Sequence, residues 1–182
     1  MVYAFLADGF EETEAIAVID LLRRAKVEVD TVSISDKYEV TSSHNFIIKA
    51  DKLIDEIDID NGEMLFLPGG IPGTPNLFAC KKLTDAIIRY NDEGKKLAAI
   101  CAAPSIFGEL GILQGKEATV YPGLEDKLKG ADYKKVKVVT DGNITTARGM
   151  GAAVEMGLEL VRILVSEEES KAQAVKIQQV IE

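Results

Sequence analysis

The 182-residue sequence predicts an α/β fold: a doubly wound, three-layer sandwich in which helices cover both faces of a mostly parallel sheet. Two observations predict this fold. Short apolar runs alternate along the chain with longer segments whose apolar residues recur at helical spacing. Strands this apolar need cover on both faces, and right-handed crossovers through helices supply that cover.

The first third of the chain begins with a strand, a helix and a second strand. Residues 2–7 are a continuous apolar run, which predicts a buried strand. Residues 11–25 carry a broad apolar face and predict a helix, and residues 27–34 are rich in valine and isoleucine, as strands are. The less regular stretch that follows fits a strand at 46–48 and a short helix at 52–57.

The middle of the chain repeats the alternation of strand and helix. Residues 64–67 predict a buried strand, and residues 77–92 a helix closed by a glycine. Residues 97–100 predict the next strand, residues 104–113 the next helix, and residues 118–121 a further strand. The strands at 64–67 and 97–100 are each followed by the helix that a parallel crossover requires.

The last part of the chain predicts a hairpin and two helices. Residues 136–140 and 144–146 flank Asp141-Gly142-Asn143, a strong turn signal. Residues 152–165 predict an apolar helix, and residues 167–181 a more polar terminal helix.

Length, charge and composition limit the possible functions. A chain of 182 residues suits one domain over 1–182, and the net charge of −9 disfavours nucleic acid and membranes as main partners. The two cysteines make no disulfide framework, so we expect a reduced, cytoplasmic setting. The single histidine and the widely spaced cysteines give no zinc-type ligand pattern, and we expect neither a metal nor a cofactor.

Cys101 is the first candidate for chemistry, because it lies where a buried strand runs directly into a helix. Ala99 and Ala103, two residues before and after it, are small, as a tight strand-turn-helix elbow requires. A thiol at a helix N-terminus should have a lowered pKa and should act as a nucleophile and an oxidation target. The alternative is a small buried core cysteine, which is our interpretation of Cys80.

A carboxylate is the second candidate. Glu11, Glu12 and Glu14 follow the first strand on the rim that should carry Cys101. Helical phase turns Glu11 and Glu14 toward the buried side and does not decide between them. A carboxyl group in a partly dry cleft should have a raised pKa and could move a proton to or from the thiol. Acids also favour helix N-termini for electrostatic reasons, which explains at least one of the three.

Gly69 and Gly70 end another predicted strand on the same rim. Glycines let the backbone approach a substrate closely, and their N–H groups can face a developing oxyanion. A simple turn explains the pair equally well. No phosphate-loop or dinucleotide fingerprint surrounds it.

These stretches together resemble the ThiJ/PfpI superfamily, whose fold is of the class I glutamine amidotransferase-like type, and most closely the subgroup of the parkinsonism-associated protein deglycase. The matching segments are Leu6-Ala7-Asp8-Gly9-Phe10-Glu11-Glu12-Thr13-Glu14, Leu67-Pro68-Gly69-Gly70, Ala98-Ala99-Ile100-Cys101-Ala102-Ala103-Pro104 and Thr146-Ala147-Arg148-Gly149. The resemblance implies a flavodoxin-like sandwich and a homodimer. It also implies glyoxalase or deglycase activity on methylglyoxal and related adducts, or oxidative-stress sensing and chaperone activity.

The resemblance also assigns roles to residues. It makes Cys101 the nucleophile and Glu14 its hydrogen-bonded partner, with Gly69, Gly70 and Ala102 as the other catalytic positions. It implies substrate binding at the pair Tyr121-Pro122.

The sequence differs from its relatives at two positions, and both differences limit the reactions that we expect the protein to catalyse. Many relatives have a histidine where this chain has Tyr121, so proton transfer falls on Glu14. The protease-like branch has a histidine immediately after the cysteine, where this chain has Ala102, which argues against peptidase activity. We expect His44, the lone histidine, to be a surface or loop residue. A glutaminase-like domain would need a catalytic histidine and is disfavoured.

Overall fold

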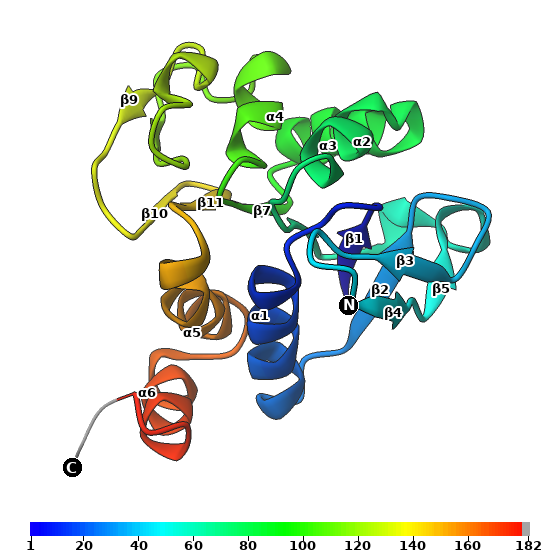
Figure 1. Cartoon of the computed structure of the whole chain (residues 1–182). Helices are drawn as coiled ribbons and strands as arrows, with labels where there is room; N and C mark the ends of the chain where they lie inside the picture. Colours follow the sequence, from blue (N-terminus) through cyan, green and yellow to red (C-terminus); the bar gives the residue numbers. More distant parts are fainter. Residues whose placement is uncertain (180–182) are drawn as a thin grey trace.

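The computed structural model describes residues 1–179, in which a seven-stranded sheet lies between two layers of helices (Figure 1). The strand order is β10-β11-β7-β6-β1-β2-β5, and only β10 runs antiparallel to its neighbour. In chain order the strands are β1 (Val2–Leu6), β2 (Val29–Ser33), β5 (Lys52–Leu53), β6 (Met64–Leu67), β7 (Lys96–Ile100), β10 (Val138–Asp141) and β11 (Ile144–Ala147). The predicted α/β sandwich is confirmed.

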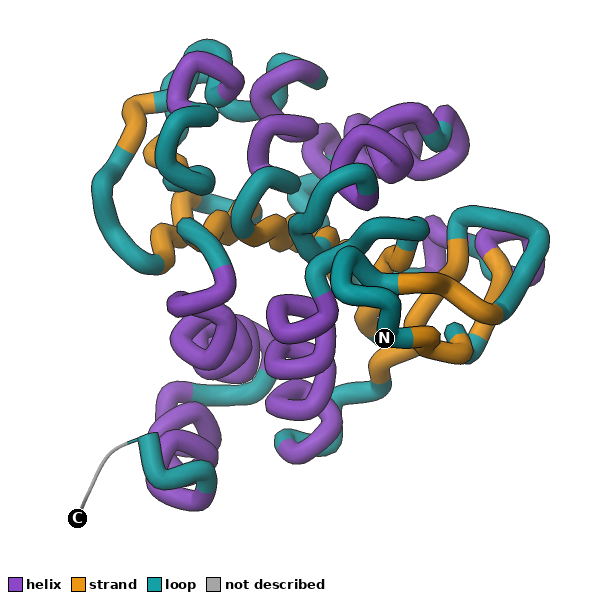
Figure 2. Tube along the Cα trace, in the orientation of Figure 1, coloured by secondary structure: helices purple, strands orange, loops and turns teal. Residues whose placement is uncertain are grey.

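Helices cover both faces of this sheet, as Figure 2 shows by colour. On one face α1 (Glu12–Arg24) lies beside α5 (Ala153–Leu164), and α6 (Glu167–Lys176) packs outside α5. The other face carries α2 (Gly73–Ala79), α3 (Lys81–Asp92) and α4 (Pro104–Glu109). Two separate apolar cores result, one on each face.

Strand β1 shows why its sequence is apolar throughout. Val2, Ala4 and Leu6 belong to the core beneath α1 and α5, whereas Tyr3 and Phe5 belong to the opposite core. Alternate side chains of a strand point to opposite faces, so a central strand with helices on both sides needs apolar residues at every position.

Short elements complete the chain. Strands β3 (Glu39–Thr41) and β4 (Ile47–Lys49) form an antiparallel hairpin, and β8 (Glu117–Ala118) pairs with β9 (Asp132–Tyr133) in parallel. The described residues also form the single-turn 3₁₀ helices η1 (Ile54–Glu56), η2 (Ile59–Asn61), η3 (Glu125–Lys127) and η4 (Met150–Ala152).

The prediction of one helix over 77–92 is wrong. The chain forms α2 and then α3, and Cys80 between them has an extended backbone (φ −76°, ψ 96°). Cys80 is partly buried and packs against the core below α3, in line with its interpretation as a packing residue. The apolar spacing runs through this break, so periodicity alone could not reveal it.

Three other predicted elements are shorter or different. The strand predicted over 118–121 is only the two-residue β8, outside the main sheet. The helix predicted over 104–113 ends at Glu109, and Gly111 beyond it has a left-handed backbone (φ 74°). Residues 52–57 form the edge strand β5 and then η1 instead of a helix.

The predicted hairpin is confirmed, with β10 and β11 joined through Gly142 and Asn143. The helix predicted over 167–181 ends at Lys176, and the last residues of that prediction, from 180 on, lie outside the described part of the chain. Among residues 1–179, no helix has the length and apolarity that crossing a bilayer requires.

Candidate active site

The sheet topology brings the predicted site segments together. Strands β7, β6 and β1 are neighbours and run parallel, so their carboxyl ends meet at one edge. Cys101 follows β7, Gly69 follows β6, and Glu14 lies in the first turn of the helix after β1. Ligands of doubly wound folds bind at this edge.

Cys101 occupies a sharp turn with a left-handed backbone (φ 63°). A residue with a side chain adopts this conformation only at a cost of about 1–3 kcal/mol, and such residues cluster at functional sites. The Cys101 N–H donates to the Ala147 carbonyl of β11 at 2.9 Å, and the Tyr121 N–H donates to the Cys101 carbonyl at 2.8 Å. Ala99 and Ala103 are fully buried, as the elbow interpretation predicts.

Glu14 is the acid that enters the site. Its side chain is 1% exposed, and its Oε2 accepts a hydrogen bond from the Gly69 N–H at 2.9 Å. Glu11 is the N-cap of α1, and its carboxylate accepts the Glu14 N–H at 2.6 Å. The structure therefore separates the two acids that helical phase left equal: Glu11 caps the helix, and Glu14 lies beside the cysteine.

The Glu14 carboxyl group lies beside Cys101, since a Cβ placed at Gly69 would be 2.6 Å from both Glu14 Oε2 and Cys101 Cβ. Burial raises the pKa of Glu14 to about 7, although hydrogen bonds from Cys101 and Gly69 lower it. The predicted raised pKa of a site carboxyl group is thus confirmed in direction. A carboxyl group with this pKa is half protonated at neutral pH, as a group that moves protons should be.

The expectation of a lowered thiol pKa is wrong for this geometry. Burial, the charge of Glu14 and the hydrogen bond to Glu14 raise the pKa of Cys101 to about 12. The backbone N–H groups of Ala102 and Gly70 act in the opposite direction and do not outweigh these causes. Helix α4 is short and begins only at Pro104, so its electrostatic contribution at the sulfur is small.

The thiol and the carboxyl group form one titrating pair. Glu14 raises the pKa of Cys101, whereas Cys101 lowers the pKa of Glu14, so the protonation of one group depends on that of the other. Once the pair has released one of its two protons, it shares the remaining one. When that proton lies on Glu14, the sulfur is a thiolate that accepts hydrogen bonds from the carboxyl group and from the two backbone N–H groups.

The two glycines have different tasks. A side chain at Gly69 would bring Cβ to 2.6 Å from both Cys101 Cβ and Glu14 Oε2, so only glycine fits between the pair. Its N–H is used by Glu14, which corrects the expectation that Gly69 faces an oxyanion. Gly70 has a left-handed backbone (φ 97°), and its N–H points to the sulfur together with that of Ala102.

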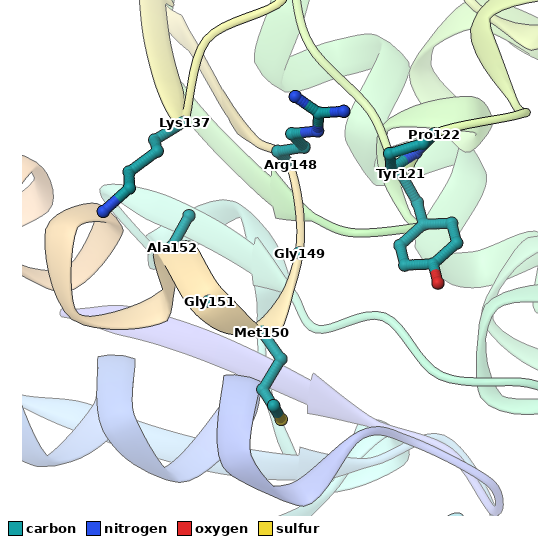
Figure 3. A pocket seen from close by; sticks show the side chains of 8 residues that line it. All are labelled: Tyr121, Pro122, Lys137, Arg148, Gly149, Met150, Gly151 and Ala152. Atoms are coloured by element: carbon teal, nitrogen blue, oxygen red, sulfur yellow. The ribbon is translucent and has the colours of Figure 1, made fainter.

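Tyr121 and Pro122 lie beside this turn and line a cavity of about 490 Å³ (Figure 3). The Tyr121 side chain is 52% exposed. The same cavity is lined by Lys137, Arg148 and residues 149–152. Sequence reasoning gave Arg148 and Lys137 no role, because their convergence depends on the β10–β11 pairing.

His44 is exposed and lies in the loop between β3 and β4, as predicted. Its Nδ1 lies 2.8 Å from Glu12 Oε1. Among residues 1–179, the only cluster of three potential metal ligands is Glu11, Glu12 and His44. Glu11 already caps α1 and Glu12 is already hydrogen-bonded to His44, so helix capping and this hydrogen bond account for the cluster.

Comparison with known proteins places these features in context. The sequence model of the DJ-1/PfpI family matches residues 1–163. Protein DJ-1 homolog B of Arabidopsis thaliana is 36% identical over 157 residues, which are 86% of this chain but only 36% of that protein. The Parkinson disease protein 7 homolog of Danio rerio is 32% identical and covers 90% of this chain and 88% of its own length.

Other relatives supply a named activity and a solved structure. A protein of Thermococcus kodakarensis named a deglycase is 31% identical over 161 residues, 87% of this chain and 95% of its own. The structure of oxidised DJ-1 from Toxoplasma gondii superposes with a TM-score of 0.93 at 33% identity, covering 97% of this chain and 96% of that one.

Proposed function

Because this chain belongs to the DJ-1/PfpI family, we propose that it is a cysteine-dependent enzyme of the glyoxalase or deglycase type. Its substrates would be methylglyoxal, related reactive aldehydes and their adducts. The observation that carries the proposal is the Glu14 carboxyl group, which is buried beside Cys101, accepts the Gly69 N–H and has a pKa that burial raises to about 7. The archaeal relative named a deglycase supports it.

The reaction starts from the arrangement in which the shared proton lies on Glu14 and the sulfur is a thiolate. The sulfur attacks the aldehyde carbon of methylglyoxal, and Glu14 gives its proton to the aldehyde oxygen, which forms a hemithioacetal. The N–H groups of Gly70 and Ala102 stabilise the negative charge that develops on this oxygen.

Glu14 then transfers a proton between adjacent carbons. As a carboxylate it removes the proton from the former aldehyde carbon, giving an enediol, and returns it to the former ketone carbon. The aldehyde carbon is thereby oxidised to a thioester and the ketone carbon reduced to an alcohol, with no external oxidant. Water cleaves the thioester, which releases lactate and regenerates Cys101.

Tyr121 and Pro122 are the proposed substrate-binding residues. Tyr121 is half exposed at the cavity beside the turn and can orient a substrate through its hydroxyl group. A tyrosine hydroxyl is a poor base near pH 7, so it is not the group that moves the proton.

The test is lactate production from methylglyoxal by four proteins. Wild type and Cys80→Ala should turn over at the same rate, because Cys80 packs against the core away from the pair. Cys101→Ala should lose the activity, and Glu14→Gln should lower it by at least a hundredfold. Equal rates in wild type, Cys101→Ala and Glu14→Gln would end the proposal.

A second candidate function is an oxidative-stress sensor or chaperone that works through oxidation of Cys101 to the sulfinate. It is favoured by the absence of an imidazole among the groups hydrogen-bonded to Cys101 in the described chain. Two peroxide molecules each transfer one oxygen to the sulfur and leave as water, and protonated Glu14 donates to the product. Intact-mass spectrometry after mild peroxide treatment tests it: Cys101 should gain two oxygens before Cys80 reacts.

We also propose a homodimer. Ile16 on α1 is 48% exposed, and Phe46 and Ile47 of the β3–β4 hairpin are 59% and 67% exposed. Exposed apolar side chains that form a contiguous patch mark surfaces that associate, and we propose that these three residues belong to such a patch. Light scattering coupled to size exclusion should give twice the 19.7 kDa chain mass, and a monomer at micromolar concentration would refute the dimer.

A further inference from the structure

The cavity beside Tyr121 has an unusual charge for this protein. Its lining residues contain two cations and no acid, although the chain carries 30 acidic and 21 basic residues. The rest of the lining is uncharged: Tyr121, Pro122, Gly149, Met150, Gly151 and Ala152. The cavity is therefore a local basic region in an acidic protein.

The two cations are held close together by the sheet. The Arg148 N–H donates to the Lys137 carbonyl at 2.9 Å, which continues the antiparallel β10–β11 pair by one step. Like charges at facing positions of an antiparallel pair destabilise each other. Figure 3 shows the two side chains pointing in different directions from these neighbouring backbone positions, and Lys137 is compensated by an ion pair with Glu155.

Arg148 lacks such compensation. Within the described part of the chain it forms no ion pair, whereas every other arginine has a carboxylate partner: Arg23 with Asp51, Arg24 with Asp20, Arg89 with Asp60 and Arg162 with Glu159. A guanidinium group presents a planar fork of donors that matches the oxygens of a carboxylate or phosphate. The guanidinium group of Arg148, which has no ion-pair partner within the described chain, thus lines a cavity with room for a ligand.

We infer that this cavity binds a small organic oxyanion, a phosphate or a carboxylate, with its charged end on Arg148. The mostly apolar lining, including Pro122, Met150 and the Tyr121 ring, would cover the uncharged body of the ligand. The position of Gly151 leaves open space where a side chain would point, since a Cβ there meets nothing within 4 Å.

The position of the cavity suggests which part of a substrate it holds. Arg148 follows Ala147, whose carbonyl accepts the Cys101 N–H, and Tyr121 donates to the Cys101 carbonyl. Two lining residues of the cavity, Tyr121 and Arg148, are therefore directly connected to the Cys101 turn through the backbone, while Cys101 itself does not line the cavity. Aldehydes or adducts that carry a phosphate or carboxylate would place that group on Arg148, and this preference rests on the proposed function. The inference that the cavity binds an oxyanion does not rest on the proposed function.

Calorimetric titration tests the binding with defined probes: phenyl phosphate, phenylacetate and the neutral benzyl alcohol. Wild type should bind at least one anion with a dissociation constant in the millimolar range or below and should not bind the alcohol. Arg148→Gln should weaken anion binding at least tenfold, and Arg148→Lys should recover part of it. Arg89→Gln, which removes a paired surface arginine, should bind as wild type does.

The outcomes separate this inference from the enzyme proposal. If anion binding persists in Cys101→Ala and the wild type produces no lactate, the anion site is supported and the enzyme proposal is refuted. If the wild type produces lactate but binds neither anion, the anion site is refuted. Equal anion binding by wild type and a folded Arg148→Gln would also refute it. Binding of phenyl phosphate without phenylacetate, or the reverse, identifies which oxyanion the site takes.

Discussion

The difference in pH-dependent stability between wild type and Glu14→Gln measures how tightly the folded protein holds the proton of Glu14. Glutamine keeps the size of the side chain but cannot titrate. Burial raises the pKa of Glu14 from 4.5 to about 7, so the folded protein holds this proton more tightly than the unfolded chain does. At about 1.4 kcal/mol for each tenfold change in proton affinity, the difference amounts to about 3 kcal/mol.

The direction follows from proton linkage. Below pH 4.5 both states carry the proton, and the wild type has its full stability. Between pH 4.5 and 7 the unfolded chain has released the proton while the folded protein still holds it, so the free energy of unfolding falls as the pH rises. Above pH 7 the loss is complete. Relative to Glu14→Gln, the wild type should therefore lose about 3 kcal/mol from pH 4 to pH 8.

Urea unfolding followed by circular dichroism suits this measurement, because the chain has no tryptophan. Wild type, Glu14→Gln and the control Glu63→Gln are unfolded at each pH. Glu63 pairs with Lys96 on the surface, so its variant should follow the wild-type pH curve. Parallel curves for wild type and Glu14→Gln would refute the buried, proton-holding carboxyl group.

Four further substitutions have expected outcomes in urea unfolding. Gly69→Ala should cost about 1–3 kcal/mol, because its Cβ would lie 2.6 Å from two side-chain atoms of the pair, whereas Gly151→Ala, with open space around it, should change stability by less than about 0.5 kcal/mol. Thr74→Val should be neutral or stabilise by about 1 kcal/mol, since the Thr74 Oγ1 is buried without a partner in the described chain; a loss above about 1 kcal/mol would show that the hydroxyl group is used. Tyr90→Phe should cost about 0.5–1.5 kcal/mol because it removes the hydrogen bond that the tyrosine hydroxyl donates to the Ile59 carbonyl at 2.5 Å, while that carbonyl still accepts the Gly62 N–H at 3.0 Å; unchanged stability would contradict a contribution of the tyrosine hydrogen bond.

The sheet could be predicted because its strands are dictated by burial. Residues 64–67 are apolar at every position, and the observed β6 has the same bounds. The rim that carries Cys101 follows from the parallel order of the strands, since strand ends gather at one edge. Elements that depend on a local backbone choice were not predictable: the apolar pattern of residues 77–92 continues through the break at Cys80.

The choice between Glu11 and Glu14 shows a second limit. Helical phase assumes that both residues are helical, but Glu11 is the N-cap and has an extended backbone (φ −85°, ψ 114°). A helical wheel does not describe its direction. The sulfur pKa was mispredicted for a related reason, because it is raised first by burial and then by the charge of Glu14, and both depend on residues that are far away in sequence. Likewise, only the tertiary structure reveals that Arg148 forms no ion pair among residues 1–179.

Glu14 should affect the reactivity of the Cys101 sulfur and the rate of turnover in opposite directions, and Glu14→Gln tests this expectation. Removing the Glu14 charge eliminates one cause of the raised thiol pKa, so the midpoint of pH-dependent alkylation by iodoacetamide should move below the wild-type value. Turnover of methylglyoxal should fall in the same variant, because the amide cannot carry a proton between carbons. A more reactive sulfur in a slower enzyme is the signature of a proton-transfer role for Glu14. If alkylation and turnover fall together, Glu14 instead serves mainly to generate the thiolate, and the proton transfer must be assigned to another group.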